Sequence, residues 1–339
     1  MRDYFIRRFL LIIPTMIGLT LLVFAITRFV PGGPMERAMM QFRMASSEGR
    51  SSGPGGGGAS LSESQLQQLK AFYGFDKPWP LAYADWLGKV CQGDLGTSTR
   101  YTEPVWDLIA ERLPVSTYFG LMTFLLSYGI CIPLGVLKAL KHQQPVDTWS
   151  SVFIFAGYAI PSFALGALLV VFCAARWQWF PVGGFTSDEF EDLSLLGQAW
   201  DILQHTALPL ICYLVGSFAF LTMMKKNSLL DNLAADYIRT AVAKGCDFKQ
   251  AVRRHALRNS FIPIATSLGH NLTLFIAGSF LIESIFDING FGLLGYQSLL
   301  DRDYPVVMGQ LVIVGVLTLL GNILSDFFVA LTDPRVRFE

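Results

Sequence analysis

Long hydrophobic runs separated by polar segments dominate the sequence. The first run extends from about residue 8 to residue 30, and five more follow the polar segment 31–112. A helix needs about 20 apolar residues to cross the roughly 30 Å hydrocarbon layer of a membrane. The alternating ten-residue strands of a membrane barrel are absent from the sequence. The pattern therefore predicts an all-α membrane protein with six transmembrane helices.

Prolines, glycines and charged residues mark the ends of these runs. The six predicted spans cover approximately residues 8–30, 113–137, 148–174, 206–224, 263–286 and 305–331. Pro114 is expected in the first turn of the second span, where a missing N–H costs least. Pro161 is expected to kink the third span. The chain thus divides into an N-terminal helix (1–30), a polar segment (31–112), a five-span core (113–331) and a tail (332–339).

The polar segment 31–112 contains several local signals. Residues 45–60, ASSEGRSSGPGGGGAS, have the low-complexity composition of a flexible spacer. An amphipathic helix is predicted over 61–73, with Ser62 as its N-cap. A second short helix is expected around residues 83–90, followed by a tight loop at 93–98.

Basic residues are distributed unevenly although the formal net charge is zero. The N-terminus, the 138–147 loop, the 225–262 segment and the C-terminal tail together hold 15 Lys and Arg residues. The two short loops on the other side hold only Arg176 and Arg302. Because short cytoplasmic loops carry the basic excess, both termini and the 225–262 segment are predicted to be cytoplasmic. The long segment 31–112, which is exempt from the rule, is predicted to be a periplasmic insert.

The segment 225–262 is the most basic polar insert between two spans. Its positive residues are Lys225, Lys226, Arg239, Lys244, Lys249, Arg253, Arg254 and Arg258. Its pattern predicts two short helices broken at Lys244-Gly245, because glycine accepts a positive φ without steric cost. We expect so short an element to bury little apolar surface against its own chain. It is therefore interpreted as an element that fits a groove on a partner.

No enzyme chemistry is indicated. The sequence lacks a Gly-rich phosphate loop ending in Lys-Ser or Lys-Thr, and its four histidines are isolated. His270 with Asn271 is interpreted as an interhelical hydrogen-bonding pair. The five cysteines have no paired spacing, so no disulfide framework, metal site or cofactor is expected in this chain.

Two carboxylates within the predicted spans, Glu283 and Asp326, are functional candidates by default. Contact with interfacial water or a neighbouring helix is an equally weighted interpretation. The loop 287–304 is interpreted either as a short re-entrant or docking helix or as an interfacial cap. The candidate pathway or gate residues are Pro161, Glu283, Asp287, Phe291 and Asp326. A proton-driven carrier would normally have several such groups near mid-membrane, which weighs against that class.

Two adjacent motifs, DYIRTAVAKG and HALRNSFIPI, resemble the cytoplasmic coupling motif of permeases in binding-protein-dependent ABC importers. Further stretches match the oligopeptide/dipeptide branch in the family's order: YFIRRFLLIIPT, PGGP, YGFDKPWP, GDLGTS, GYAIPSF, ESIFDINGFGLLGY, RDYPVV and TDPRVRF. The Gly/Ser insert, GYAIPSF and TMMKKNSLLDNL are most similar to the Yej subfamily, associated with oligopeptide and microcin C uptake. The general motif begins Glu-Ala-Ala, whereas Arg239-Thr240-Ala241 stands here, so no role is carried over for that carboxylate.

The resemblance implies a MetI-like type I importer fold in the bacterial inner membrane. It implies a homologous second permease, two ABC ATPase subunits or one fused ATPase that bind ATP and Mg²⁺, a periplasmic peptide-binding protein and a peptide substrate. Lipid surrounds such a subunit, and nucleic acid has no part. The residues implied to contact or brace the ATPase junction are Tyr237, Thr240, Ala241, Lys244, Gly245, Arg258 and Asn259. Nickel, dipeptide or glutathione import and a stand-alone carrier or channel remain the alternatives.

Overall fold

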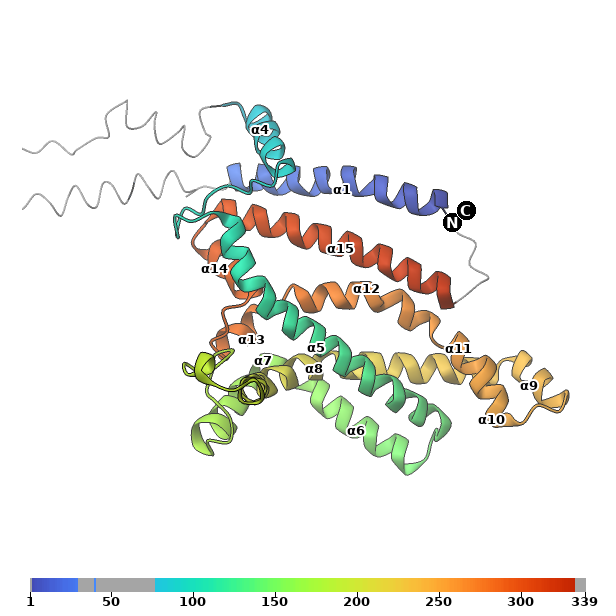
Figure 1. Ribbon diagram of the computed structural model, residues 1–339. Helices are drawn as coiled ribbons and strands as arrows, with labels where there is room; N and C mark the ends of the chain where they lie inside the picture. Colours follow the sequence, from blue (N-terminus) through green and yellow to red (C-terminus); the bar gives the residue numbers. More distant parts are fainter. Residues whose placement is uncertain (1, 30–39, 41–76, 333–339) are drawn as a thin grey trace, which may run out of the picture. The chain divides into compact units, whose positions relative to one another are not determined.

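The computed structural model describes residues 2–29, 40 and 77–332, which are mostly helical (Figure 1). The predicted spacer at 45–60, the predicted helix at 61–73 and the tail after Thr332 lie outside the described residues. The chain forms two compact units. The first contains Met1–Phe9, Arg112–Leu294 and Val316–Glu339, and the second contains Leu10–Glu111 and Gly295–Gly315.

Four helices of the described residues are long and apolar enough to cross a membrane. They are α1 (Arg2–Phe29), α5 (Val105–Leu140), α8 (Leu195–Ala234) and α15 (Tyr304–Thr332). A fifth candidate is the bent pair of α6 (Pro145–Ala159) and α7 (Ser162–Leu169), the latter continuing in π-helical turns to Arg176. The all-helical fold is thus confirmed, whereas the number six stays a prediction.

The bend between α6 and α7 measures 89°. Ile160 is extended, with φ −90° and ψ 122°, and Pro161 follows with φ −56° and ψ 132°. A residue before proline avoids the helical region because the proline ring crowds its backbone. The kink predicted at Pro161 is confirmed, and it is a near right-angle turn.

The continuous helix predicted over 263–286 is wrong. Two helices occupy this stretch, α12 (Ile262–Ile276) and α13 (Phe280–Ile285). Between them Gly278 adopts φ +76°, and a Glu283 carboxylate oxygen fills the space that a side chain at Gly278 would need. The break therefore places a buried carboxylate against the chain, which hydropathy alone does not reveal.

Two other helices are longer than predicted. α5 begins at Val105, so Pro114 lies inside it and the first-turn prediction is wrong. α8 begins at Leu195, where the Ser194 hydroxyl accepts a hydrogen bond from the Gly197 N–H, and it runs for 40 residues. It therefore takes in part of the predicted 175–205 loop and the first ten residues of the 225–262 segment. Leu229, Leu230 and Leu233 continue its helical spacing past the predicted membrane end.

Within the first unit, the main apolar core joins α5, α8 and α13. Its buried members include Phe119, Leu208, Cys212, Ile282 and Phe286. In Figure 1, helices α9 (Asp236–Ala243), α10 (Phe248–Ala251) and α11 (Leu257–Asn259) lie at one end of α8, and α13 lies toward the other end.

The helices α12 and α15 approach each other at two glycines in the first unit. A side chain at Gly269 would overlap the backbone of Gly321. The Ser325 hydroxyl accepts from the Gly269 N–H at 2.8 Å and donates to the Thr266 carbonyl at 2.8 Å. Small residues with a hydroxyl bridge are typical of tightly packed membrane helices.

In the second unit, α4 (Trp79–Cys91) packs on α1 through Tyr83. The Tyr83 hydroxyl lies 2.9 Å from the Thr20 hydroxyl and donates to the Ile17 carbonyl at 3.1 Å. The helix predicted around residues 83–90 is therefore confirmed. The loop that follows has the positive-φ glycines Gly93 and Gly96, as a tight loop requires.

The buried carboxylate of Asp303 holds this loop, within the same unit. It accepts hydrogen bonds from the Ser98 hydroxyl and from the backbone N–H groups of Thr99 and Arg100. An ion pair between Arg100 and Asp301 lies beside them. Residues separated by about 200 positions are thus joined by one acceptor.

Candidate functional site

The helices α9 to α11 form a compact turn, here called the elbow (residues 235–261). Its first helix, α9, ends at Ala243, and after Lys244 the chain reverses at Gly245 with φ +90°. The Gly245 N–H donates to the Val242 carbonyl at 2.9 Å, and the Cys246 N–H donates to the Ala241 carbonyl at 3.1 Å. These two bonds form a Schellman motif, in which glycine is the favoured residue at the positive-φ position. The helix break predicted at Lys244-Gly245 is confirmed.

The elbow begins where α8 stops at Ala235, an extended residue with φ −70° and ψ 145°. Asp236 opens α9, where a negative side chain suits the positive end of the helix dipole. The Tyr237 hydroxyl donates to the side-chain amide oxygen Oδ1 of Asn232 at 2.5 Å. This bond ties the first turn of α9 back to the last turns of α8.

The inner face of the elbow is buried against the first unit's own helices. Ile238 of α9 is 3% exposed and clusters with Leu229 of α8, Ala139 of α5, Ala251 and Ala256. The expectation that the elbow buries little apolar surface against its own chain is therefore wrong. The reason is that α8 and α5 continue as far as the elbow and form a platform beneath it.

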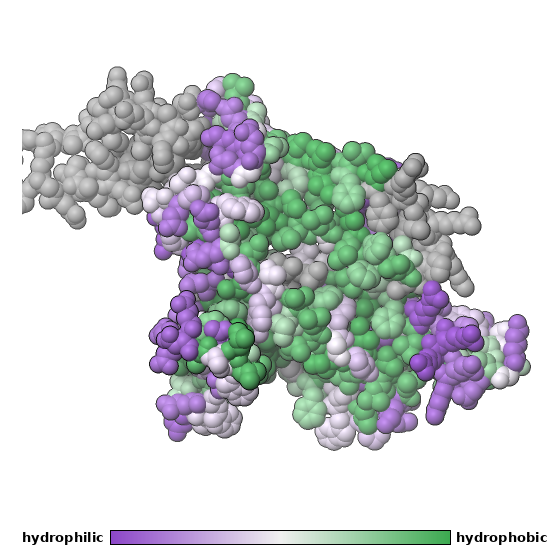
Figure 2. Space-filling view, viewed as in Figure 1, coloured by the Kyte–Doolittle hydropathy of each residue, from purple (hydrophilic) through white to green (hydrophobic). Residues whose placement is uncertain are grey.

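The outer face of the elbow combines apolar and basic side chains. Tyr237, Val242 and Phe248 are 38%, 42% and 53% exposed. The exposed basic residues around them are Arg239, Lys244, Lys249, Arg253 and Arg254. Figure 2 shows hydrophilic residues gathered over the end that α9 and α10 occupy, next to a mainly hydrophobic surface. Aromatic and arginine side chains together are typical of the anchoring part of protein interfaces.

The predicted contact residues divide between the two ends of the elbow. Tyr237, Thr240, Lys244 and Gly245 are exposed on α9 and its turn, and Ala241 is half-buried beneath them. Arg258 and Asn259 lie on α11, where the chain returns toward α12. The contact role of the first group and the bracing role of the second stay predictions.

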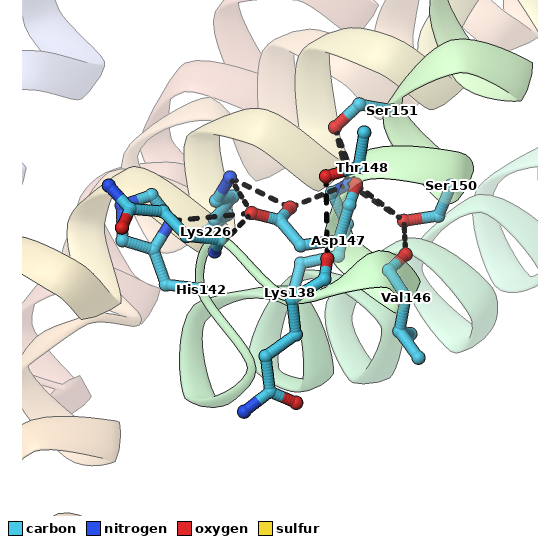
Figure 3. Close-up of polar contacts among 10 residues, drawn as sticks. Lys138, His142, Val146, Asp147, Thr148, Ser150, Ser151 and Lys226 are labelled. Atoms are coloured by element: carbon cyan, nitrogen blue, oxygen red, sulfur yellow. Dashed lines mark hydrogen bonds and ion pairs between the residues drawn. The ribbon is translucent and has the colours of Figure 1, made fainter.

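A buried ionic cluster lies behind the elbow, at the junction of α5, α6 and α8 (Figure 3). Asp147, in the first turn of α6, is 5% exposed. Lys226 of α8 donates to both of its carboxylate oxygens at 2.8 Å. His142 Nδ1 lies 3.3 Å from one of these oxygens, and the Gln143 N–H donates to the same oxygen at 3.2 Å. Asp147 thus joins α8 to the turn between α5 and α6.

Lys138, near the end of α5, is fully buried and completes this cluster. Its ammonium nitrogen lies 3.0 Å from an Asp147 carboxylate oxygen and donates to the Asp147 backbone carbonyl at 2.8 Å. It also donates to the Ser150 and Ser151 hydroxyls at 2.8 and 2.7 Å. Every partner is in the first two turns of α6, so the end of α5 is fixed to the start of α6.

Lys225, the neighbour of Lys226 on α8, is also fully buried, but it contacts the end of the elbow and not Asp147. Its ammonium donates to the Ser260 hydroxyl at 2.8 Å and lies 3.5 Å from the centre of the Phe261 ring. A side chain at Gly135 of α5 would collide with Lys225. Lys225 therefore occupies a tight crossing of α5 and α8 and contacts the returning end of the elbow.

The sequence pattern counts Lys225 and Lys226 among the basic residues of the 225–262 segment, whereas the structure buries both side chains on α8. Sequence reasoning missed Asp147 altogether. One signal was available: a lysine at the end of an apolar span needs a counter-charge when it is buried. Asp147 is the only acidic residue of the 138–147 loop.

Among the pathway candidates, Glu283 is 1% exposed and binds the start of α14 (Phe291–Leu300). Its carboxylate accepts from the Leu293 N–H at 2.5 Å and from the Ser116 hydroxyl at 3.4 Å. Ser116 in turn accepts from the Phe291 N–H at 2.7 Å, and Phe291 is buried. Contact with a neighbouring helix, one part of the interpretation of Glu283, is therefore confirmed through Ser116 of α5, and a helix within the 287–304 loop is also confirmed.

The other three pathway candidates, Asp287, Pro161 and Asp326, lie at different elements of the fold. Asp287 is exposed at φ 50°, between α13 and α14, and Pro161 stands at the α6–α7 bend. Asp326 of α15 pairs with the Arg8 guanidinium at 3.2 Å and accepts from the Tyr4 hydroxyl at 3.0 Å. Contact with a neighbouring helix, one of the two interpretations of Asp326, is confirmed.

Comparison with known protein families identifies the family to which this arrangement of residues belongs. The profile described as "Binding-protein-dependent transport system inner membrane component" matches residues 131–338. The chain belongs to this family. The matched range contains every candidate residue of the elbow and of the pathway, together with the Lys138–Asp147–Lys226 cluster.

Relatives of this transport family align over the full length of the chain. The chain is 37% identical to the "Inner membrane ABC transporter permease protein YejB" of Escherichia coli O157:H7, covering 100% of both chains. It is 36% identical to the "Peptidoglycan transport system permease protein YejB" of Agrobacterium fabrum, covering 100% of this chain and 99% of the relative. It is 35% identical to the "Oligopeptide transport system permease protein AppB" of Bacillus subtilis, again over 100% of both. The resemblance to peptide ABC importer permeases is confirmed.

A solved structure supports the fold of this permease family. The MetNI methionine ABC transporter in an inward-facing conformation matches with a TM-score of 0.50 at 18% identity. The match covers 67% of this chain and 96% of that chain. This likeness concerns the fold alone. The family match, the full-length relatives and the apolar helices together identify the chain as an integral inner-membrane permease.

Proposed function

We propose that this permease forms the transmembrane pathway of an ATP-driven importer of oligopeptides and that its elbow receives the partner ATPase. The observation that carries the proposal is the two-faced elbow. Its inner face is buried on α5 and α8, whereas its outer face presents Tyr237, Val242 and Phe248 among basic residues. An element fixed to its own helices on one side and open on the other is suited to transmit a partner's movement.

The proposed orientation puts the elbow and both termini in the cytoplasm. Support comes from the excess of Lys and Arg on that side. The proposed assembly contains a homologous second permease, two ABC ATPase subunits or one fused ATPase, and a periplasmic peptide-binding protein. The ATPases bind ATP and Mg²⁺, and this chain contributes no catalytic residue to hydrolysis.

The proposed coupling is mechanical. When the ATPases close on ATP, they displace α9, and Ile238 passes the displacement to Leu229 of α8 and Ala139 of α5. Closely packed interiors transmit displacement because they have little free volume. Alternation between inward-facing and outward-facing states is the expected result, a two-state change that nucleotide and peptide both bias.

The names of the relatives support a peptide substrate. Oligopeptide transport appears in the name of AppB, and peptidoglycan transport appears in that of the Agrobacterium YejB. The chemistry common to both is a short peptide. Uptake of microcin C, a peptide antibiotic, is proposed as a third case of the same chemistry.

The test is reconstitution with the native partners. The tagged permease is expected to copurify with the second permease and the ATPase. In proteoliposomes supplied with the binding protein, an oligopeptide should stimulate ATP hydrolysis and accumulate with it. Separate arms with a free oligopeptide, a peptidoglycan-derived peptide and microcin C determine the substrate class. Peptide movement by the purified chain alone, without ATP, would refute the proposal.

A further inference from the structure

Two adjacent lysines on α8 bind different partners, because Lys225 contacts Ser260 of the elbow and Lys226 contacts Asp147 of α6. We infer that Lys225, Lys226 and Asp147 are positioning residues for coupling. Lys225 fixes the returning end of the elbow to α8, and Lys226 and Asp147 fix α8 to α6 and, through Lys138, to α5. This inference rests on the proposed function, because coupling presupposes a partner ATPase. The placement of these side chains is tested independently below.

The first link runs through Lys226. Its bidentate contact with Asp147 joins positions 79 residues apart and connects α8 to the start of α6. Lys138 then connects the same carboxylate to the end of α5. Three helices therefore meet at one buried carboxylate, immediately behind the cluster that Ala139 and Leu229 form with Ile238 of the elbow.

The second link runs through Lys225. The chain leaves α8 at Ala234, passes through the elbow and returns at Ser260, where Lys225 binds the hydroxyl. Lys225 thus closes the elbow into a loop that begins and ends on α8. Neighbouring residues of a helix point about 100° apart, which allows Lys225 and Lys226 to serve these two sites from one turn.

Burying three lysines and one aspartate costs desolvation free energy, which a purely structural role would not require. Lys138, Lys225 and Lys226 are buried, and Asp147 is the carboxylate that pairs with two of them. Within the described residues, the Lys225 ammonium contacts the Ser260 hydroxyl and the face of the Phe261 ring. Replacing a buried ion pair with apolar residues is often neutral or stabilising, so such pairs are better suited to fixing one geometry than to adding stability.

Under the proposed function, the ATPase pushes on the outer face of the elbow. The inner face must then keep its position on α5 and α8, because otherwise the movement would be lost. Apolar contacts such as Ile238 with Ala139 transmit displacement across the packed surface, but they are non-directional and do not fix the register along the helices. Charged hydrogen bonds are directional and hold a register. The ionic links therefore supply what the apolar platform lacks, a defined position along α5 and α6.

The test uses the complete transporter with the substitutions Asp147→Asn, Lys226→Met and Lys225→Met. Lys141→Met is the matched control, because Lys141 is exposed in the same α5–α6 turn. Peptide transported per ATP hydrolysed should fall by about tenfold in the three variants, a typical size for a lost coupling. The ATPase should still copurify, because the outer face of the elbow is unchanged. A uniform fall in transport and hydrolysis, with their ratio unchanged, would overturn the inference.

Two further variants keep the test decisive if one of the single variants fails to assemble. Lys226→Arg keeps the charge and should restore the wild-type ratio. The double variant Asp147→Asn with Lys226→Met breaks the link and removes one negative and one positive charge, so the net charge of the cluster is unchanged. Lys138 keeps its hydrogen bonds to the Asp147 backbone carbonyl and to the Ser150 and Ser151 hydroxyls. It should assemble and remain uncoupled. Normal coupling in the double variant would also overturn the inference.

Amide hydrogen exchange on the purified permease gives a readout that needs no ATPase. Exchange at residues 236–251 should speed up by about tenfold in Asp147→Asn relative to Lys141→Met, as loss of local protection predicts. Equal exchange would refute the placement. If wild-type protein shows no ATP-driven uptake, the proposed function fails, and the exchange result still decides whether these residues hold the elbow.

Discussion

The turn at Gly245 allows backbone strain to be separated from contact with a partner. Gly245 has φ +90°, and no atom of the described residues lies within 4 Å of where its Cβ would be. Alanine therefore meets no clash here and pays only for the left-handed backbone, roughly 1–2 kcal/mol. Asparagine tolerates this conformation better, so Gly245→Asn should cost less.

Gly245→Trp has the same backbone cost as Gly245→Ala but adds a large ring on the outer face of the elbow. If that face seats in a partner, the ring separates the surfaces. A cost of about 1.4 kcal/mol already lowers a binding constant tenfold. We therefore expect near wild-type uptake for Gly245→Asn, a modest loss for Gly245→Ala and loss of ATP-driven uptake for Gly245→Trp.

Gly93 supplies the control for this series. It has φ +84°, and a Cβ there also has no neighbour within 4 Å, but it belongs to the loop after α4. Gly93→Trp should therefore reproduce the backbone strain without touching the elbow. Uptake is measured in proteoliposomes that contain ATP inside and the binding protein with peptide outside, and membrane insertion is checked by detergent extraction and gel filtration.

Two results would refute this reasoning. Normal peptide uptake by Gly245→Trp would show that the outer face needs no close contact. Equal losses in Gly245→Trp and Gly245→Ala would show that Gly245 serves the Schellman turn alone. Either result would leave the fold of the elbow intact and remove its proposed contact.

Three other substitutions test the packing. Gly269→Leu should prevent folding of the permease, measured as loss of a monodisperse gel-filtration peak, because its side chain overlaps the Gly321 backbone; Gly216→Leu, with an open Cβ site, is the control. Glu283→Ala should destabilise by about 1–3 kcal/mol, because it leaves the buried Ser116 hydroxyl and Leu293 N–H without their acceptor; an unchanged thermal midpoint would contradict this. Asp303→Ala should increase proteolysis at residues 96–104, since it removes the acceptor of Ser98, Thr99 and Arg100; equal cleavage rates would count against it.

Local chemistry was the most predictable part of this protein. The helix break at Gly245 and the turn at Pro161 follow from properties of single residues, and both are confirmed. Helix ends were predicted poorly because hydropathy marks the membrane boundary rather than the end of the helix. α8 shows this directly, since its polar last turns from Lys225 to Ala234 remain helical.

Long-range features were not predictable from the pattern. The platform under the elbow joins Ile238 to Ala139, and the ionic cluster joins Lys226 to Asp147. Neither pair shares a sequence window. The break before Glu283 has the same origin, because the carboxylate reaches Ser116 of another helix.

Burial of three lysines bears on the orientation argument, because that argument counted them as loop charges. Removing Lys138, Lys225 and Lys226 from the fifteen basic residues leaves twelve, against Arg176 and Arg302 on the other side. The asymmetry therefore survives the correction. Insertion also reads charge before the helices pack, so lysines that are later buried still contribute to the choice of side. Under the proposed orientation, the same lysines direct insertion of the chain and afterwards join α8 to α5, to α6 and to the elbow.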